Sequence, residues 1–139
     1  MLETQQKTKQ YKNVAVAIIR DEDGKVLLIK PSESTDNGRN NSDWEFPANV
    51  IVPGATYTET FVAEILEVSG CIVEAVSLVS SEKFHTAALH FEYVECKVVC
   101  RDSKFKPNGS GNHKWVHPTK VRTVLKRRLN KDITSFLGI

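Results

Sequence analysis

The order of apolar and polar residues predicts a mixed α/β fold. Residues 14–19 form a continuous apolar run, which is typical of a central strand buried on both faces. A turn at residues 21–24 and a second apolar run at residues 26–29 predict that the chain returns as a hairpin. Further strands are predicted at residues 50–52, at 71–80, within 84–100 and at 113–117, with a turn at 81–83.

A capped helix is predicted over residues 57–69. Thr56 followed by Glu59 forms a capping box, and Gly70 supplies the left-handed residue that commonly closes a helix. Glu64 and Glu67, spaced i and i+3, lie together on one side of this helix. Such a pair is either a solvated helix face or a cation site. Apolar residues share a broad arc on the other side: Tyr57, Phe61, Val62, Ile65, Leu66 and Val68.

The C-terminal part predicts two short helical segments. Pro118 suits the first turn of a helix, and residues 133–137 predict a final helical turn that docks apolar groups. A core-facing stripe follows Pro118 at i, i+3, i+4 and i+8: Val121, Val124, Leu125 and Leu129. The basic residues of this segment mostly lie outside the stripe, which favours a solvated face.

Two segments read as loops. Residues 31–43 contain no aliphatic side chain and form a long exposed loop, and loops of this length are often functional. Arg39 is the only basic residue in it, so it is a candidate contact for a substrate phosphate, with a freely solvated arginine as the alternative. Residues 101–111 are predicted to be a loop by their Pro, Asn and Gly content. Residues 1–10 are polar and are predicted to be a disordered tail.

Residues 49–71 resemble the Nudix box, G-x5-E-x7-R-E-U-x-E-E-x-G-U with U aliphatic. The lead-in Trp44-Glu45-Phe46-Pro47-Ala48-Asn49 is similar to the W-x-x-P-G-G segment that precedes the box. The alignment needs no gap: Glu64 falls on the glutamate after the arginine, Glu67 on the first of the E-E pair, and Gly70 on the closing glycine. The opening hairpin and the Trp115-Val116 segment also look like Nudix domains. The resemblance implies an α/β/α sandwich with a mixed central sheet, as one domain over residues 1–139.

The resemblance also implies a chemistry. In the family the box glutamates bind magnesium and activate water, which assigns Glu64 and Glu67 as metal ligands and catalytic residues, with Mn²⁺ as an alternative to Mg²⁺. Asn49, at the first box glycine, is a candidate substrate contact, because asparagine tolerates the left-handed backbone that a glycine would adopt there.

Half of that chemistry is missing from this chain. Ala63 stands at the box arginine and Val68 at the last glutamate. Many family members have a further metal-binding glutamate before the late tryptophan, where this chain has Asn112, His113 and Lys114. Glu45, Glu59 and Glu95 are candidate replacement acids, although their spacing does not single any of them out.

Composition limits the class of protein. The chain has 139 residues, 40% hydrophobic and 26% charged, as expected for one globular domain. No apolar run approaches the ~20 residues of a membrane span, and the N-terminus lacks the apolar region of a secretory signal. Three cysteines without metal spacing predict reduced thiols in a cytoplasmic protein.

Charge is divided unevenly along the chain. Residues 1–100 carry 9 Lys/Arg and 15 Asp/Glu, whereas residues 101–139 carry 10 and 2. The basic segment lacks interleaved aromatic residues and any nucleic-acid motif, so a nucleic-acid-binding protein is the least favoured of three hypotheses. The other two are nearly balanced. One is a divergent Nudix hydrolase of nucleoside diphosphate derivatives, with weak or lost activity. The other is an inactive Nudix-fold module that binds a nucleotide-like molecule. The sequence leaves substrate and oligomeric state open.

Overall fold

The computed structural model describes residues 10–30, 43–102, 112–126 and 128–139. Its elements, in chain order, are β1 (Lys12–Arg20), β2 (Val26–Ile29), β3 (Ala48–Val50), α1 (Tyr57–Ser69), β4 (Cys71–Phe84), β5 (Leu89–Arg101), β6 (His113–Val116), α2 (Pro118–Leu125) and α3 (Lys131–Leu137). The predicted tail at 1–9, the loop at 31–42 with Arg39, and most of the 101–111 loop lie outside the described residues.

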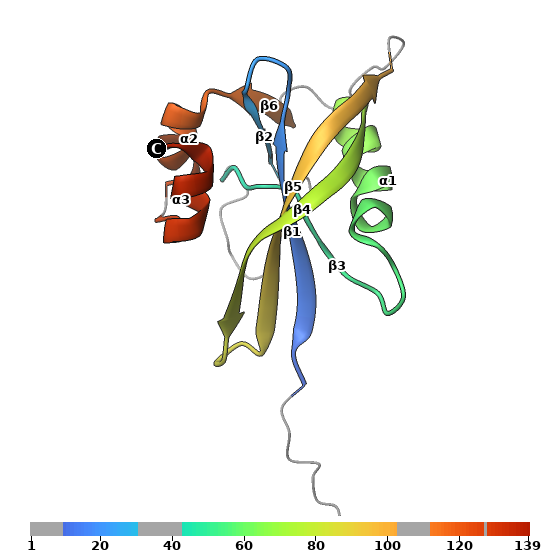
Figure 1. Cartoon of the computed structure of the whole chain (residues 1–139), viewed down its shortest axis with the longest axis vertical. Coiled ribbons are helices and arrows are strands. Elements are labelled where there is room, and N and C mark those ends of the chain that lie inside the picture. The colour runs from blue at the N-terminus through green and yellow to red at the C-terminus, as the bar shows by residue number, and fades with distance from the viewer. Residues whose placement is uncertain (1–9, 31–42, 103–111, 127) are drawn as a thin grey trace, which may run out of the picture.

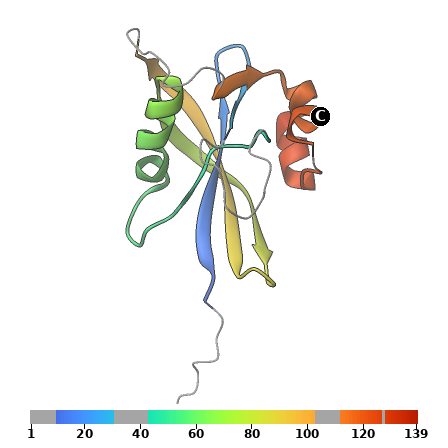
Figure 2. The same ribbon diagram turned by 180° about the vertical axis from the view of Figure 1, so that it is seen from behind.

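The strands form one mixed sheet in the order β4-β5-β1-β2-β6, with β3 paired to β1 beside β2. β1 and β5 are parallel, and the other strand pairs are antiparallel. Helix α1 covers one face, while α2 and α3 lie together on the other (Figures 1 and 2). The predicted α/β/α sandwich with a mixed central sheet is confirmed.

Strand β1 separates two apolar cores because its side chains alternate between faces. Ala15, Ala17 and Ile19 pack on the α1 side, and Val16 and Ile18 pack on the side of α2 and α3. All five are buried, so the continuous apolar run of β1 is explained by burial on both faces.

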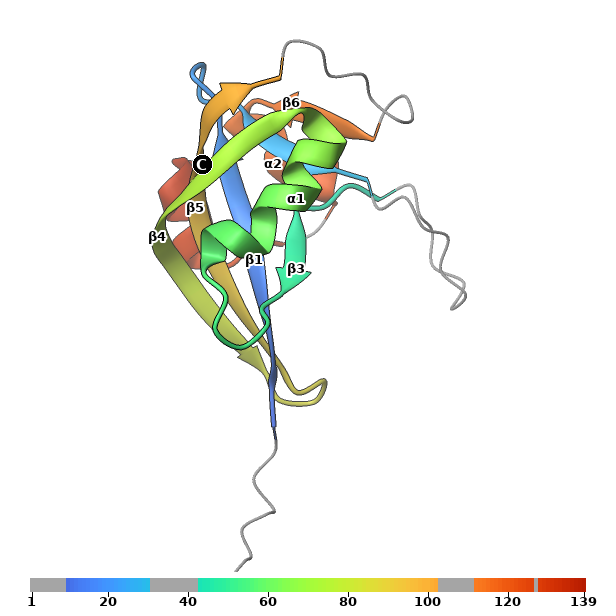
Figure 3. The same ribbon diagram turned by 90° about the vertical axis from the view of Figure 1, so that its right-hand side faces the viewer.

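Helix α1 has the predicted boundaries and caps. The Glu59 amide donates to the Thr56 hydroxyl (3.1 Å), and the Thr56 amide donates to the Glu59 carboxylate (2.9 Å). Gly70 closes the helix with φ of 76°. The helix packs against β1, β3 and β4 (Figure 3).

We expect Thr56→Ala to lower the free energy of unfolding by about 1 kcal/mol, because the hydrogen bond from the Glu59 amide to the Thr56 hydroxyl is lost, while the backbone amide of residue 56 remains a donor to the Glu59 carboxylate. Urea denaturation of the two proteins would measure the difference. Thr123→Ala, at an exposed position of α2, is the matched control. An equal loss in both variants would contradict the assignment of the cap.

Four details of the sequence prediction are wrong. The third strand is Ala48–Val50, because a turn closed by the Ala55 amide on the Val52 carbonyl (3.0 Å) ends it early. Residues 81–83 are not a turn: β4 continues to Phe84 in register with β5, and the Glu82 carboxylate accepts a hydrogen bond from Tyr93 (3.1 Å). Leu66 is 38% exposed, at the edge of the helical arc. The helical stripe predicted from Val121 to Leu129 is interrupted: helix α2 ends at Leu125, because Lys126 has a left-handed backbone (φ 61°).

The basic C-terminal segment is solvated on one side, as predicted. Arg122, Lys126 and Arg128 are exposed, whereas Val121 and Leu125 are buried. In the described part of the chain, no helix is long and apolar enough to cross a membrane.

Candidate functional site

Glu64 and Glu67 project from the second half of α1. Glu64 is half-buried, and its Oε1 atom is buried without a hydrogen-bond partner. Burial raises the pKa of Glu64, and the negative charge of Glu67 raises it further. Glu67 itself is exposed. A buried carboxylate oxygen without a donor is costly, so this position favours a cation or a proton at Glu64.

The two substituted box positions have different surroundings. Ala63 is exposed on the solvent side of α1, so an arginine side chain at this position would extend into solvent. Val68 packs against the apolar core on the α1 face, together with Phe61 and Ile65. The last position of the glutamate pair therefore contributes to packing in this chain.

Asn49 lies beside α1, but its side chain is already engaged. Its Nδ2 donates to the Thr60 carbonyl (3.1 Å), and its Oδ1 accepts from the Val50 amide (3.0 Å). Asn49 belongs to β3, and its φ is not positive, so the left-handed backbone expected at this position is wrong. The reason is the pairing of Asn49 with Ala15 of β1, which holds it extended.

The candidate replacement acids have other partners. Glu59 completes the helix cap, Glu95 lies 3.8 Å from Arg20 and accepts from Ser77, and Glu45 also has an interaction partner. Among the described residues, no three His, Cys, Asp or Glu side chains are grouped as a metal site. The residues present therefore fit one ion held through Glu64 and Glu67, rather than a cluster of ions.

Comparisons with known proteins identify the family of this chain. The family described as NUDIX domain matches residues 10–136. The chain belongs to the Nudix family.

The individual proteins that this chain resembles share only part of its sequence. The Nudix chain is 31% identical over 88 residues to the Xenopus laevis protein "Nucleoside diphosphate-linked moiety X motif 6", and the match covers 63% of this chain but 38% of that protein. It is similar in fold to a Nudix hydrolase from Nitrosomonas europaea (TM-score 0.69, 18% identity, 94% of this chain and 72% of the other). It is also similar to the MutT protein from Methanosarcina mazei Go1 (TM-score 0.60, 22% identity, 94% and 92%).

A pocket at the start of the Nudix helix was missed by the sequence analysis. It has a volume of about 390 Å³ and is lined by Asn13, Ile51, Ala55, Thr56, Tyr57 and Glu92. The Tyr57 hydroxyl donates to the Glu92 carboxylate. Burial and this carboxylate raise the pKa of Tyr57 to about 12. The alternation of residues along β5 does not tell which face of the strand is turned to α1. The contact between Glu92 and Tyr57 therefore could not be predicted from the sequence.

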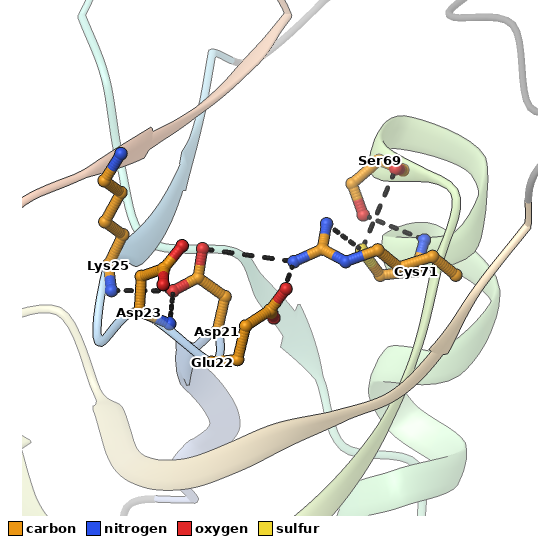
Figure 4. A network of polar contacts seen from close by, with 7 residues as sticks. Asp21, Glu22, Asp23, Lys25, Ser69 and Cys71 are labelled. Atoms are coloured by element: carbon orange, nitrogen blue, oxygen red, sulfur yellow. Dashed lines mark hydrogen bonds and ion pairs between the residues drawn. The ribbon is translucent and has the colours of Figure 1, made fainter.

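Arg101 connects three parts of the Nudix fold at the end of β5. Its guanidinium lies 3.2 Å from Glu22 and 3.9 Å from Asp21 in the β1–β2 turn. It also donates to the Cys71 sulfur (3.6 Å) at the start of β4, and it stacks over Trp115 (5.2 Å). Figure 4 shows the contacts of this guanidinium with Asp21, Glu22 and Cys71. Its contacts join structural segments and include neither box glutamate.

Proposed function

We propose that this chain is a divergent Nudix hydrolase that acts slowly on a nucleoside diphosphate derivative with a weakly held Mg²⁺ ion. The observation that carries the proposal is the unpartnered Oε1 atom of Glu64 in a box whose helix, caps and register are intact. Nudix hydrolases generally use divalent metal ions. The matched Xenopus laevis relative carries the name "Nucleoside diphosphate-linked moiety X motif 6".

Glu64 and Glu67 would hold the ion, and Glu64 would serve as the base. The ion would supply charge neutralisation at phosphorus and a more acidic water. Magnesium prefers hard oxygen ligands and retains several waters, so two carboxylates suffice for weak binding. We expect an affinity on the order of millimolar, from the dependence of affinity on ligand charge. Mn²⁺ is the alternative ion, and a cytoplasmic location remains a prediction.

The second candidate is a Nudix-fold module that binds a nucleotide without hydrolysing it. The packing of Val68 into the core favours this candidate, because one ligand position has become apolar. Phosphoryl transfer depends on positioning and electrostatics. This chain has Ala63 in place of the box arginine and Val68 in place of the last glutamate, so we expect a sharply lower rate of hydrolysis. The two candidates differ in turnover and share the nucleotide-like ligand.

We expect Glu64→Gln to abolish any Mg²⁺- or Mn²⁺-dependent phosphate release from nucleoside diphosphate derivatives. Glutamine removes the charge that holds the ion and the group that accepts the proton, while it keeps the size of the side chain. A phosphate-release screen of both proteins would measure this. Glu74→Gln, at an exposed position of β4, is the matched control.

The outcomes separate the two candidates. Metal-dependent release that disappears only in Glu64→Gln supports the hydrolase. Nucleotide binding with no release in the native chain supports the module. Brisk release that survives Glu64→Gln would contradict the proposed site.

A further inference from the structure

Three side chains from separate segments converge on one face of the sheet, beyond the end of β2. Ile29 is bridged to Glu45 and paired with His113, while Leu28 is paired with Lys114. Because side chains alternate along strands, Lys30, Trp44 and Lys114 share the face of Leu28. Ile29, Glu45 and His113 share the opposite face. Burial agrees: Leu28 and Trp44 pack in the core beside α2 and α3, and Ile29 packs in the core beside α1.

Both lysines reach the same indole ring. The Lys114 Nζ lies 4.4 Å from the centre of the Trp44 ring, and the Lys30 Nζ lies 5.0 Å from it. All three residues are half-buried. Contacts of this kind attract an ammonium to the face of the ring, so Trp44 holds two positive charges near each other at a partly exposed place.

These two charges lack a compensating anion within the described residues. Neither Lys30 nor Lys114 forms an ion pair with a carboxylate there. Two acids flank Trp44 in the chain. Glu45 is directed to the other face by the strand alternation, and, in the part of the chain that the structure describes, Asp43 is exposed and forms no ion pair with either lysine. Like charges held together repel, and a bound anion relieves that repulsion more strongly where water is partly excluded.

We propose that Lys30, Trp44 and Lys114 form a diphosphate platform, which binds the diphosphate group of a nucleoside diphosphate derivative without a metal ion. The identity of this ligand rests on the proposed function. Two ammonium groups against one rigid ring suit an extended anion with two charged centres, and lysine is a common point-charge ligand of phosphate. The platform supplies positive charge independently of Glu64 and Glu67, the two glutamates that this chain keeps at the glutamate positions of the box.

The test is a titration of the protein with inorganic pyrophosphate in EDTA, followed by the indole N–H signals in NMR. We expect the Trp44 signal to shift and the Trp115 signal to stay, with Trp44→Phe assigning the two. In the double variant Lys30→Gln/Lys114→Gln, binding should weaken by about tenfold or more, because two charge-assisted contacts are lost. The dissociation constant should rise with salt concentration.

The matched control is the double variant Lys120→Gln/Lys131→Gln, which removes two exposed lysines from α2 and α3. Its pyrophosphate affinity should stay within about twofold of the native value, because screening weakens distant surface charges. Equal weakening in both double variants, an equal response to acetate at matched ionic strength, or no shift of Trp44 would overturn the platform. Thermal unfolding of each variant checks that it is folded.

A failure of the platform can be distinguished from a failure of the proposed function. Glu64→Gln should bind pyrophosphate in EDTA like the native chain, since the platform contains neither box glutamate. Pyrophosphate binding by a native chain that releases no phosphate would overturn the hydrolase and keep the platform. Hydrolysis with no Trp44 shift would overturn the platform and keep the hydrolase.

Discussion

Phe61→Ala should lower the free energy of unfolding by about 3–5 kcal/mol, because it removes a large buried ring and leaves a cavity. Phe61 is 0% exposed and lies in the core between α1 and the sheet, with Ile65 and Val94. Since α1 also carries Glu64 and Glu67, loosening of this contact would displace both carboxylates. Urea denaturation at constant m-value measures the change.

The matched control for Phe61→Ala is Leu66→Ala in the same helix. Leu66 is 38% exposed and outside the core, so its truncation should cost well under half as much. Equal losses in the two variants would mean that burial of the Phe61 ring does not set the cost, because alanine has the higher helix propensity in both cases. A near-neutral Phe61→Ala would mean that the packed face of α1 is wrongly assigned.

Local signals along the chain predicted much of the fold. The capping box at Thr56, the left-handed closure at Gly70 and the apolar run of β1 are each specified by a few adjacent residues, and all three are confirmed. The errors arose where long-range pairing decides. Polar residues at 81–83 are typical of a turn, but the ladder with β5 holds them in a strand. Val52 has high strand propensity, but the following turn takes its carbonyl.

The candidate site was only partly predictable for the same reason. Glu64 and Glu67 are neighbours by helical spacing alone, so the sequence brings them together. The hydrogen bond from Tyr57 to Glu92 joins residues 35 positions apart and depends on which face of β5 is turned to α1. Predicting the diphosphate platform would require both the register of β2 with β6 and the bridge between Ile29 and Glu45, which sets the face of Trp44. The roles of Glu64, Glu67, Arg39 and Asn49 remain predictions.

Restoring the box should raise both metal affinity and hydrolysis. In the double variant Ala63→Arg/Val68→Glu, a third carboxylate joins Glu64 and Glu67, and an arginine offsets their mutual repulsion. We expect divalent-ion affinity to rise by roughly tenfold or more, following the dependence of affinity on the number of charged ligands. Isothermal titration with Mn²⁺ and the phosphate-release assay would measure affinity and rate separately.

We expect the gain in metal affinity and hydrolysis to be accompanied by a loss of folding stability. Observing both changes in the same double variant is a more specific test than either change alone. Val68 packs against the core on the α1 face, so a glutamate there should lower the free energy of unfolding by roughly 1–3 kcal/mol in the absence of metal. Binding of the ion to the folded state should recover part of that loss. Ala63→Arg alone, at an exposed position, should change stability little and affinity less than the double variant. If the restored activity persisted after Glu64→Gln was added, the reaction would depend on residues outside the box.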